Sequence, residues 1–301
     1  MSVLEDFQLP LFGGPSLDKI VNVASVPQLS PFRYPGGKTW LVPHVRQWCI
    51  SLSSRPAEFI EPFAGGAIIG LTVAAEQLAE HVTLVELDDQ VAAVWKTIIY
   101  GDAEWLASRI VNFELTPDSL EEILSQAYVS LQEKAFQTIL KNRVNRGGIL
   151  APGAGRLKQG ENGRGIKSRW YPQTLAKRIL NIARIRKRIT FIEGDGLEVL
   201  RQNAYRKDTA FFIDPPYTAA GKKAGARLYT HFELDHEELF RIASTLGGDS
   251  LITYENAGGV RDLAERYGFD IEVVAMKNTH HAEMTELLIG RNLDWARSRP
   301  L

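Results

Sequence analysis

Four consecutive residues, Asp214, Pro215, Pro216 and Tyr217, have side chains suited to holding a planar ring that carries an amino group. They follow an apolar run at 210–213, which is typical of a buried strand. The Asp214 carboxylate can accept a hydrogen bond from an exocyclic NH2, the Pro215 carbonyl can accept a second, and Tyr217 can stack on the ring. A strand followed by a plain proline turn is the alternative. Because open α/β sheets bind ligands at the carboxyl ends of their strands, we favour a catalytic site.

A second candidate site lies where Gly65 and Gly66 follow a short predicted strand at 58–60. A glycine turn lets the backbone approach a ligand closely. Glu86 lies 20 residues past Gly66 at the end of the next predicted strand, which is the place of the acid that holds ribose hydroxyls in Rossmann-like folds. The segment has no GxGxxG pattern and no phosphate-binding lysine, so it indicates an adenosine ligand without phosphates. A turn that only serves packing is the alternative.

Residues 141–188 form a basic, glycine-rich segment. They contain 14 Lys and Arg but a single acid, Glu161, so the segment carries +13 and the rest of the chain carries −14. A solvated surface is the ordinary cause of such a run, but the glycines and the aromatic residues Trp170 and Tyr171 favour contact with nucleic-acid phosphates. The preferred contact is the Arg143 and Arg146 pair. The full set of candidate contacts is Arg143, Asn145, Arg146, Arg156, Lys158, Arg164, Lys167 and Arg169.

The elements that must position these groups alternate between strand and helix, which is typical of an α/β fold. Strands are predicted at 58–60, 82–86, 189–192, 210–213, 250–254, 270–275 and 286–289. Helices are predicted at 39–48, 67–78, from Asp88 or Asp89 to Ile99, at 197–200, 235–243 and 259–266, and across the amphipathic stretch 101–140. We therefore expect a leader at 1–30, an α/β domain built from 31–100 and 185–301, and a helical, basic insertion at 101–184.

Composition sets the class of protein. The chain has 301 residues, 45% of them hydrophobic and 24% charged, so it can bury a substantial core as one large or two ordinary domains. It has no apolar run of the roughly 18 residues that a membrane helix needs, and Glu5, Asp6 and Pro10 interrupt any signal-peptide pattern. Cys49 is the single cysteine, and the histidines lack metal-binding spacing. These features predict a soluble, cytoplasmic protein without a metal site.

The order of three motifs resembles a known family. The sequences PFRYPGGK at 31–38, EPFAGG at 61–66 and, after a long insert, DPPY at 214–217 resemble the Dam-type DNA adenine-N6 methyltransferases, the α-ordered group or D12 class. The resemblance extends to Asp195 after a predicted strand. Beyond the DPPY motif it includes Tyr229, Phe232, Asp235 and His236. It departs at Ala67, where many relatives have glycine, and at 276–286, where relatives often have a basic residue. His236 is interpreted as a residue near a helix cap.

The resemblance implies a Rossmann-like, S-adenosylmethionine-dependent methyltransferase sheet with the insertion as target-recognition region. It places Glu86 on the cofactor ribose, Asp195 on the cofactor adenine, and Tyr34 and Lys38 near the methionine end. The whole cofactor set it implies is Tyr34, Lys38, Phe63, Gly65, Glu86, Asp195 and Asp214. It makes the DPPY loop catalytic, with Asp214 and the Pro215 carbonyl holding the target amine and Tyr217 stacked on the base.

The expected activity is therefore site-specific methyl transfer from S-adenosylmethionine to the N6 of an adenine flipped out of duplex DNA. We expect a monomer that acts on double-stranded DNA, with a cognate restriction endonuclease as a candidate partner. Cytosine-N4 and RNA adenine-N6 methylation are alternatives, because both substrates present an exocyclic amine; Asp rather than Ser before Pro-Pro-Tyr favours adenine. A non-catalytic DNA-binding protein on the same fold is the alternative of a different class.

Overall fold

The structure is a computed structural model that describes residues 16–17, 19–34, 36–160, 163–216, 234–277 and 283–297. Tyr217, Tyr229, Phe232 and the acid Glu161 lie outside the described residues, so the roles expected for them stay predictions. Within the described ranges, no helix is both long and apolar enough to cross a membrane.

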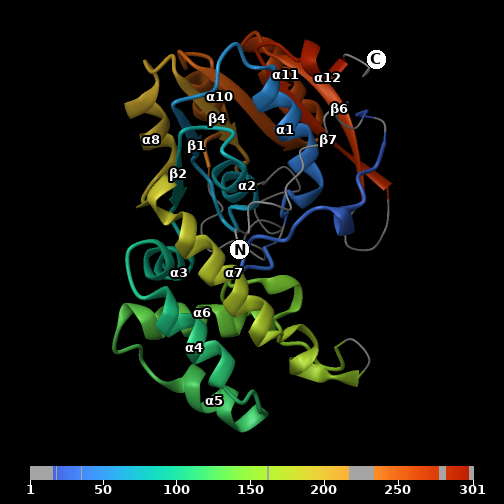
Figure 1. The fold of residues 1–301 in the computed structure, drawn as a ribbon. Helices are drawn as coiled ribbons and strands as arrows, with labels where there is room; N and C mark the ends of the chain where they lie inside the picture. Colours follow the sequence, from blue (N-terminus) through green and yellow to red (C-terminus); the bar gives the residue numbers. More distant parts are fainter. Residues whose placement is uncertain are drawn as a thin grey trace.

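Seven strands form one sheet in the order β3-β2-β1-β4-β5-β7-β6 (Figure 1). The strands are β1 (Glu58–Glu61), β2 (His81–Glu86), β3 (Ile189–Glu193), β4 (Thr209–Ile213), β5 (Asp249–Glu255), β6 (Asp270–Lys277) and β7 (Glu283–Gly290). The neighbours from β3 to β5 pair in parallel, whereas β7 runs antiparallel to β5 and β6. The predicted α/β class and Rossmann-like sheet are confirmed. The strand order changes direction between β1 and β4, and open sheets bind their ligands at such a point.

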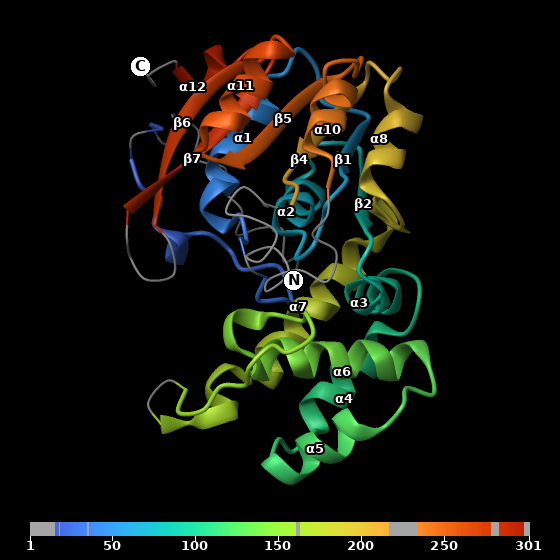
Figure 2. The same ribbon diagram turned by 180° about the vertical axis from the view of Figure 1, so that it is seen from behind.

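Helices cover both faces of the sheet (Figures 1 and 2). One layer contains α1 (Val42–Ser51), α2 (Ile68–Glu76) and α3 (Asp89–Ile99), and the other contains α8 (Gly196–Asn203), α10 (His236–Ala243) and α11 (Gly258–Arg266). Successive strand residues point to opposite faces; in β4, Phe211 packs into the second layer and Phe212 into the first. Asp88 caps α3 by accepting from the amides of Gln90 and Val91, so one of the two predicted caps is confirmed.

Four more helices gather beyond one end of the sheet, beside α3 (Figure 1). They are α4 (Ala103–Asn112), α5 (Pro117–Ser125), α6 (Leu131–Val144) and α7 (Pro172–Ile185). Helix α6 packs on α3, and α7 packs on α4. Phe113 contacts Phe136 and Trp170 edge-on, with ring centroids 5.2 and 6.1 Å apart. These aromatic residues belong to the same hydrophobic cluster as α1, α2 and α3, so the helical group is continuous with the first layer of the sheet domain.

The remaining helical segments are short. They are α12 (Asp294–Arg297) and the 3-10 turns Val23–Ser25, Thr39–Leu41, Arg146–Gly148, Gly165–Arg169 and Arg186–Arg188.

Candidate active site

Acidic residues lie at the carboxyl ends of three adjacent strands in the middle of the sheet. Glu86 ends β2, Glu61 ends β1, and Asp214 follows the last residue of β4. Because β2, β1 and β4 are adjacent in the sheet, these residues from distant parts of the sequence lie near one another. The charges of Asp214 and Glu86 both act on Glu61. The strand order therefore assembles the two candidate sites expected from the sequence into one.

Glu61 was not singled out from the sequence, although it lies inside the EPFAGG motif. Its side chain is buried, with 4% exposed, and Oε2 accepts a hydrogen bond from the Gly70 amide at 2.8 Å. Burial raises the pKa of Glu61 well above its usual range; the Gly70 N–H opposes this, and the charges of Asp214 and Glu86 add to it. A Cβ atom at residue 70 would lie 2.6 Å from this carboxylate, so glycine is needed for the approach. A carboxyl group thus caps the first turn of α2.

Glu86 lies partly exposed at the end of β2. Oε2 accepts from the Gly65 amide and Oε1 from the Asp88 amide, both at 2.8 Å. Burial raises the pKa of Glu86 to about 7; the Asp88 N–H opposes this, and the Asp88 charge adds to it. Each carboxylate oxygen can accept a further hydrogen bond, so Glu86 can hold two hydroxyl groups.

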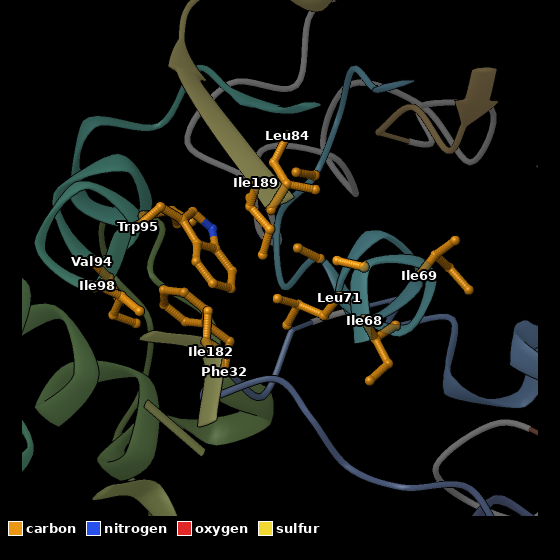
Figure 3. Packing of buried hydrophobic residues seen from close by; sticks show 14 of the residues in the cluster. Phe32, Ile68, Ile69, Leu71, Leu84, Val94, Trp95, Ile98, Ile182 and Ile189 are labelled. Carbon is orange, nitrogen blue, oxygen red and sulfur yellow. The ribbon is translucent and has the colours of Figure 1, made fainter. Parts of the chain in front are cut away.

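Tyr34 packs directly on the glycine loop after β1. A Cβ atom at residue 65 would lie 2.6 Å from the Tyr34 ring, and Gly65 has a φ of 46°, which favours glycine. The Gly65 carbonyl accepts from Trp95 Nε1 at 3.0 Å, and Trp95 packs against Phe32 (Figure 3). Ala67 also has a left-handed backbone, with a φ of 51°, a conformation that glycine adopts more readily than alanine.

Phe63 and Asp195 come together across the sheet edge. Asp195 caps α8 by accepting from the Leu197 amide at 2.9 Å. The next residue, Gly196, lies so close to the β1 loop that a Cβ atom there would be 2.2 Å from the Pro62 carbonyl oxygen and 2.9 Å from the Phe63 ring. A flat apolar ring after β1 and a carboxylate after β3 therefore lie on either side of the end of β2, a pairing suited to a purine.

Two groups among the described residues hold Asp214. Lys38 Nζ lies 3.0 Å from Oδ1, and the Thr253 hydroxyl on β5 donates to the same oxygen at 2.9 Å. Lys38 is 3% exposed; it also donates to the Gly36 carbonyl at 2.9 Å and lies 3.6 Å from Glu286 on β7. Lys38 thus links the turn at 36–38 to the end of β4 and to the middle of β7, and holds the Asp214 carboxylate. Pro215 is buried and Pro216 partly exposed beside it.

A protein-family model decides the family. The model described as D12 class N6 adenine-specific DNA methyltransferase matches residues 34–279. The chain belongs to this family. It is therefore an enzyme that transfers a methyl group to the N6 of adenine in DNA.

Other comparisons are more distant. No match was found among curated proteins. Among solved structures, a provisionally assigned RNA methyltransferase from Pyrococcus horikoshii aligns with 10% identity and a TM-score of 0.40 over 91% of this chain and 92% of that chain. A precorrin-6y C5,15-methyltransferase from Geobacter metallireducens aligns with 11% identity and a TM-score of 0.33 over 82% of this chain and 84% of that chain. At this level of similarity, neither adds to the argument.

His236 of the methyltransferase is the first residue of α10, next to its cap Asp235, as expected from the sequence. Its Nδ1 lies 2.7 Å from the hydroxyl of Tyr254 on β5. Burial lowers the pKa of His236, and burial with the nearby Asp214 charge raises that of Tyr254. A neutral histidine paired with a protonated tyrosine therefore supports the second layer behind Asp214.

The basic segment of the methyltransferase is not uniformly at the surface. Arg143 is 5% exposed and donates to the Pro31 carbonyl, so it does not belong to an exposed phosphate-contacting surface with Arg146. Helical spacing places Arg143 on the buried side of α6, which the count of charges could not reveal. Arg143 and Arg146, predicted together as contacts, thus differ in exposure, and their contact with nucleic acid stays a prediction.

The other candidate contacts lie nearer to solvent. The exposed ones are Arg146, Arg156, Lys158, Arg164 and Lys167, whereas Asn145 and Arg169 are partly exposed. Arg156 pairs with Glu121, and the Arg164 guanidinium lies 5.7 Å from the Tyr171 ring centroid. Asn145 donates to the Ile149 carbonyl at 2.8 Å, which shapes the turn at 146–148. Five of the eight candidate contacts are thus exposed cations.

Proposed function

We propose that the methyl donor is S-adenosylmethionine, bound across the carboxyl ends of β3, β2, β1 and β4. Glu86 would hold the ribose hydroxyls, and Phe63 with Asp195 would hold the adenine. Tyr34, Gly65 and Lys38 would line the path toward Asp214. The donor supplies a methyl group on a positively charged sulfur.

The start of α2 supports a ligand without phosphates. Dinucleotide-binding sheets hold a pyrophosphate at the helix that follows β1, where unpaired N–H groups attract an anion. In this chain the buried carboxyl group of Glu61 already accepts from Gly70 in the first turn of α2, and a phosphate would meet a competing acceptor. An adenosyl group with a cationic methionine portion fits these residues.

Asp214 is the residue that we propose to act on the target base. The adenine N6 lone pair is delocalised into the ring, so the amine is a poor nucleophile. Asp214 and the Pro215 carbonyl, as two acceptors for the NH2 hydrogens, would hold the nitrogen with its lone pair toward the methyl group. Lys38 and Thr253 fix the carboxylate, and such positioning supplies several kcal/mol of a barrier. Tyr217 would stack on the base.

The substrate that we propose is double-stranded DNA, from which the adenine flips out, because its N6 cannot reach a protein site from within the helix. The exposed cations Arg146, Arg156, Lys158, Arg164 and Lys167 would contact phosphates, so we propose that the insertion 101–184 is the target-recognition region. One chain would suffice for the reaction, and a cognate restriction endonuclease is the candidate partner.

The observation that carries this proposal is the placement of Asp214 and Glu86 at the carboxyl ends of β4 and β2, on either side of the Gly65 loop. The test is incubation of the purified protein with S-adenosylmethionine and unmethylated genomic DNA, followed by sequencing that maps modified bases. We expect N6-methyladenine within one short recognition sequence. Methylation of cytosine N4 or of RNA alone, or cofactor binding without methylation, would contradict the proposal.

Cofactor binding should depend on pH through Glu86. The pKa of this group is about 7 in the folded chain, above the ordinary 4.5, so the fold itself favours the protonated form below pH 7. Ribose hydroxyls that donate to the carboxylate favour the ionised form instead. Affinity for a non-reactive cofactor analogue should therefore be highest above pH 7 and fall, by at most about tenfold per pH unit, as the pH drops toward 5.

The matched control is Glu86→Gln, which cannot titrate. In calorimetry it should bind more weakly at pH 8 and show a flat profile between pH 5 and 7. A parent profile that is already flat would remove Glu86 from the ribose site.

A further inference from the structure

Two arginines of the basic segment converge on the residues just before Tyr34. Arg143 of α6 donates to the Pro31 carbonyl. Arg178 of α7 donates through Nη1 to the Ser30 carbonyl at 3.0 Å. Helices α6 and α7 thus hold two consecutive carbonyl groups of one extended segment.

Arg33 and Arg169 complete the group. Arg33 follows the two held carbonyls in sequence, and the charge of Arg169 lowers the pKa of both Arg33 and Arg143. Burial, followed by the charges of Arg178, Arg33 and Arg169, lowers the pKa of Arg143 to about 9. We call Arg33, Arg143, Arg169 and Arg178 the arginine cluster.

Three members of the arginine cluster, Arg33, Arg143 and Arg178, are placed near one another without an acidic partner among the described residues. In the described part of the chain, no acid forms an ion pair with Arg33, Arg143 or Arg178. Two guanidinium nitrogens, Nη1 of Arg33 and Nε of Arg143, are buried without a hydrogen-bond partner. Arg143 is buried, and Arg33 and Arg178 are partly exposed. Placing like charges together with unsatisfied guanidinium nitrogens is costly, and an anion bound among them would offset that cost.

The arginine cluster also lies close to the proposed cofactor site. Fully buried Asn142 accepts from the Arg33 amide at 2.9 Å and donates to the Arg33 carbonyl at 2.8 Å and the Gly148 carbonyl at 2.7 Å. The residue after Arg33 is Tyr34, which packs on Gly65. An anion bound to the arginine cluster would therefore contact α6, α7 and the segment 30–34, which packs on the Gly65 loop through Tyr34.

We infer that the arginine cluster binds one backbone phosphate of the DNA substrate, and so joins the basic segment to the catalytic site. The inference rests on the proposed function, because it takes DNA as the anion. A phosphodiester carries one negative charge and several acceptor oxygens, and the guanidinium fork matches it better than any other side chain. Free inorganic phosphate has the same chemistry, so the experiment must separate the two sources.

The experiment measures binding of a labelled duplex to Arg33→Gln, Arg178→Gln and the double variant over a range of salt concentrations. Each single variant should bind about tenfold more weakly near 0.1 M salt. Neutralising one phosphate changes the log–log salt slope by about 0.9. Because both arginines would share that phosphate, the double variant should lose about one unit of slope rather than two. Without DNA, Arg33→Gln should unfold at the same or a higher temperature than the parent, since it removes a repulsive charge.

Arg55→Gln is the matched control. Arg55 also donates to a backbone carbonyl, that of Ala79, at 2.9 Å, but it precedes β1 at the opposite edge of the sheet. It should keep the parent slope. All variants should bind a cofactor analogue as tightly as the parent does. If the parent protein itself does not bind the analogue, that result counts against the proposed function and not against the arginine cluster.

Two results would overturn the inference. One is a parent-like slope in Arg33→Gln and Arg178→Gln. The other combines two observations: inorganic phosphate at constant ionic strength stabilises the parent but not Arg33→Gln, and Arg33→Gln binds the duplex as tightly as the parent does. Together they would make the site one for free phosphate.

Discussion

Replacing Asp214 with Ala should reduce methyl transfer by at least about a hundredfold, the low end for loss of one positioned catalytic group. The change removes the carboxylate at the end of β4 that we propose to hold the target amine. Affinity for a cofactor analogue should change much less, because Glu86, Phe63 and Asp195 lie at other strand ends. Single-turnover methylation of a duplex substrate, with calorimetry of the analogue, measures both effects.

The matched variant for this prediction is Thr253→Val. It removes one hydrogen bond to Asp214 Oδ1, at 2.9 Å, but keeps the carboxylate and its contact with Lys38. The loss of rate should be smaller than in Asp214→Ala, because Thr253→Val removes one hydrogen bond to the carboxylate but keeps the carboxylate itself. Near-parent methylation by Asp214→Ala would show that the amine is held elsewhere.

Replacing Glu86 with Ala should weaken S-adenosylmethionine binding by roughly 10- to 150-fold. Hydrogen bonds to a charged group are worth about 1.5–3 kcal/mol, and each 1.4 kcal/mol is about a tenfold change in affinity. The variant also leaves the amides of Gly65 and Asp88 without their acceptor, so its thermal unfolding should be recorded alongside calorimetry of the cofactor.

Glu193→Ala is the control for Glu86→Ala. Glu193 ends β3 and is paired in register with Glu86, but its carboxylate forms an ion pair with Lys96. It should keep parent affinity for the cofactor. Equal affinities in both variants would exclude Glu86 as a cofactor ligand.

The sequence predicts the sheet well because strand ends carry local signals. Apolar runs that stop at Glu86 and Asp214 located β2 and β4, and the glycine turn located the start of α2. The sequence alone could not show that β1 lies between β2 and β4, since strand order depends on crossovers and not on local pattern. That order is what brings the two acids to one edge.

The buried polar groups were the hardest to predict. Glu61 and Arg143 are charged residue types that are rarely buried, so pattern analysis assigns them to the surface. Their burial depends on partners far along the chain, the Pro31 carbonyl for Arg143 and the neighbouring strand ends for Glu61. The contact of Lys38 with Asp214 likewise joins residues that are far apart in the sequence.

Asn142 ties the Arg33 backbone to the Gly148 carbonyl through its hydrogen bonds. This connection affects any attempt to change which DNA sequence this enzyme modifies. A graft of another family member's insertion at 101–184 would bring new partners for the Arg33 backbone and for Gly148, where even a Cβ atom would lie 2.0 Å from the Arg33 carbonyl oxygen. In such a chimera the contact between residue 33 and the new insertion would be mismatched directly beside Tyr34. Residues 30–34 should therefore be exchanged together with the insertion.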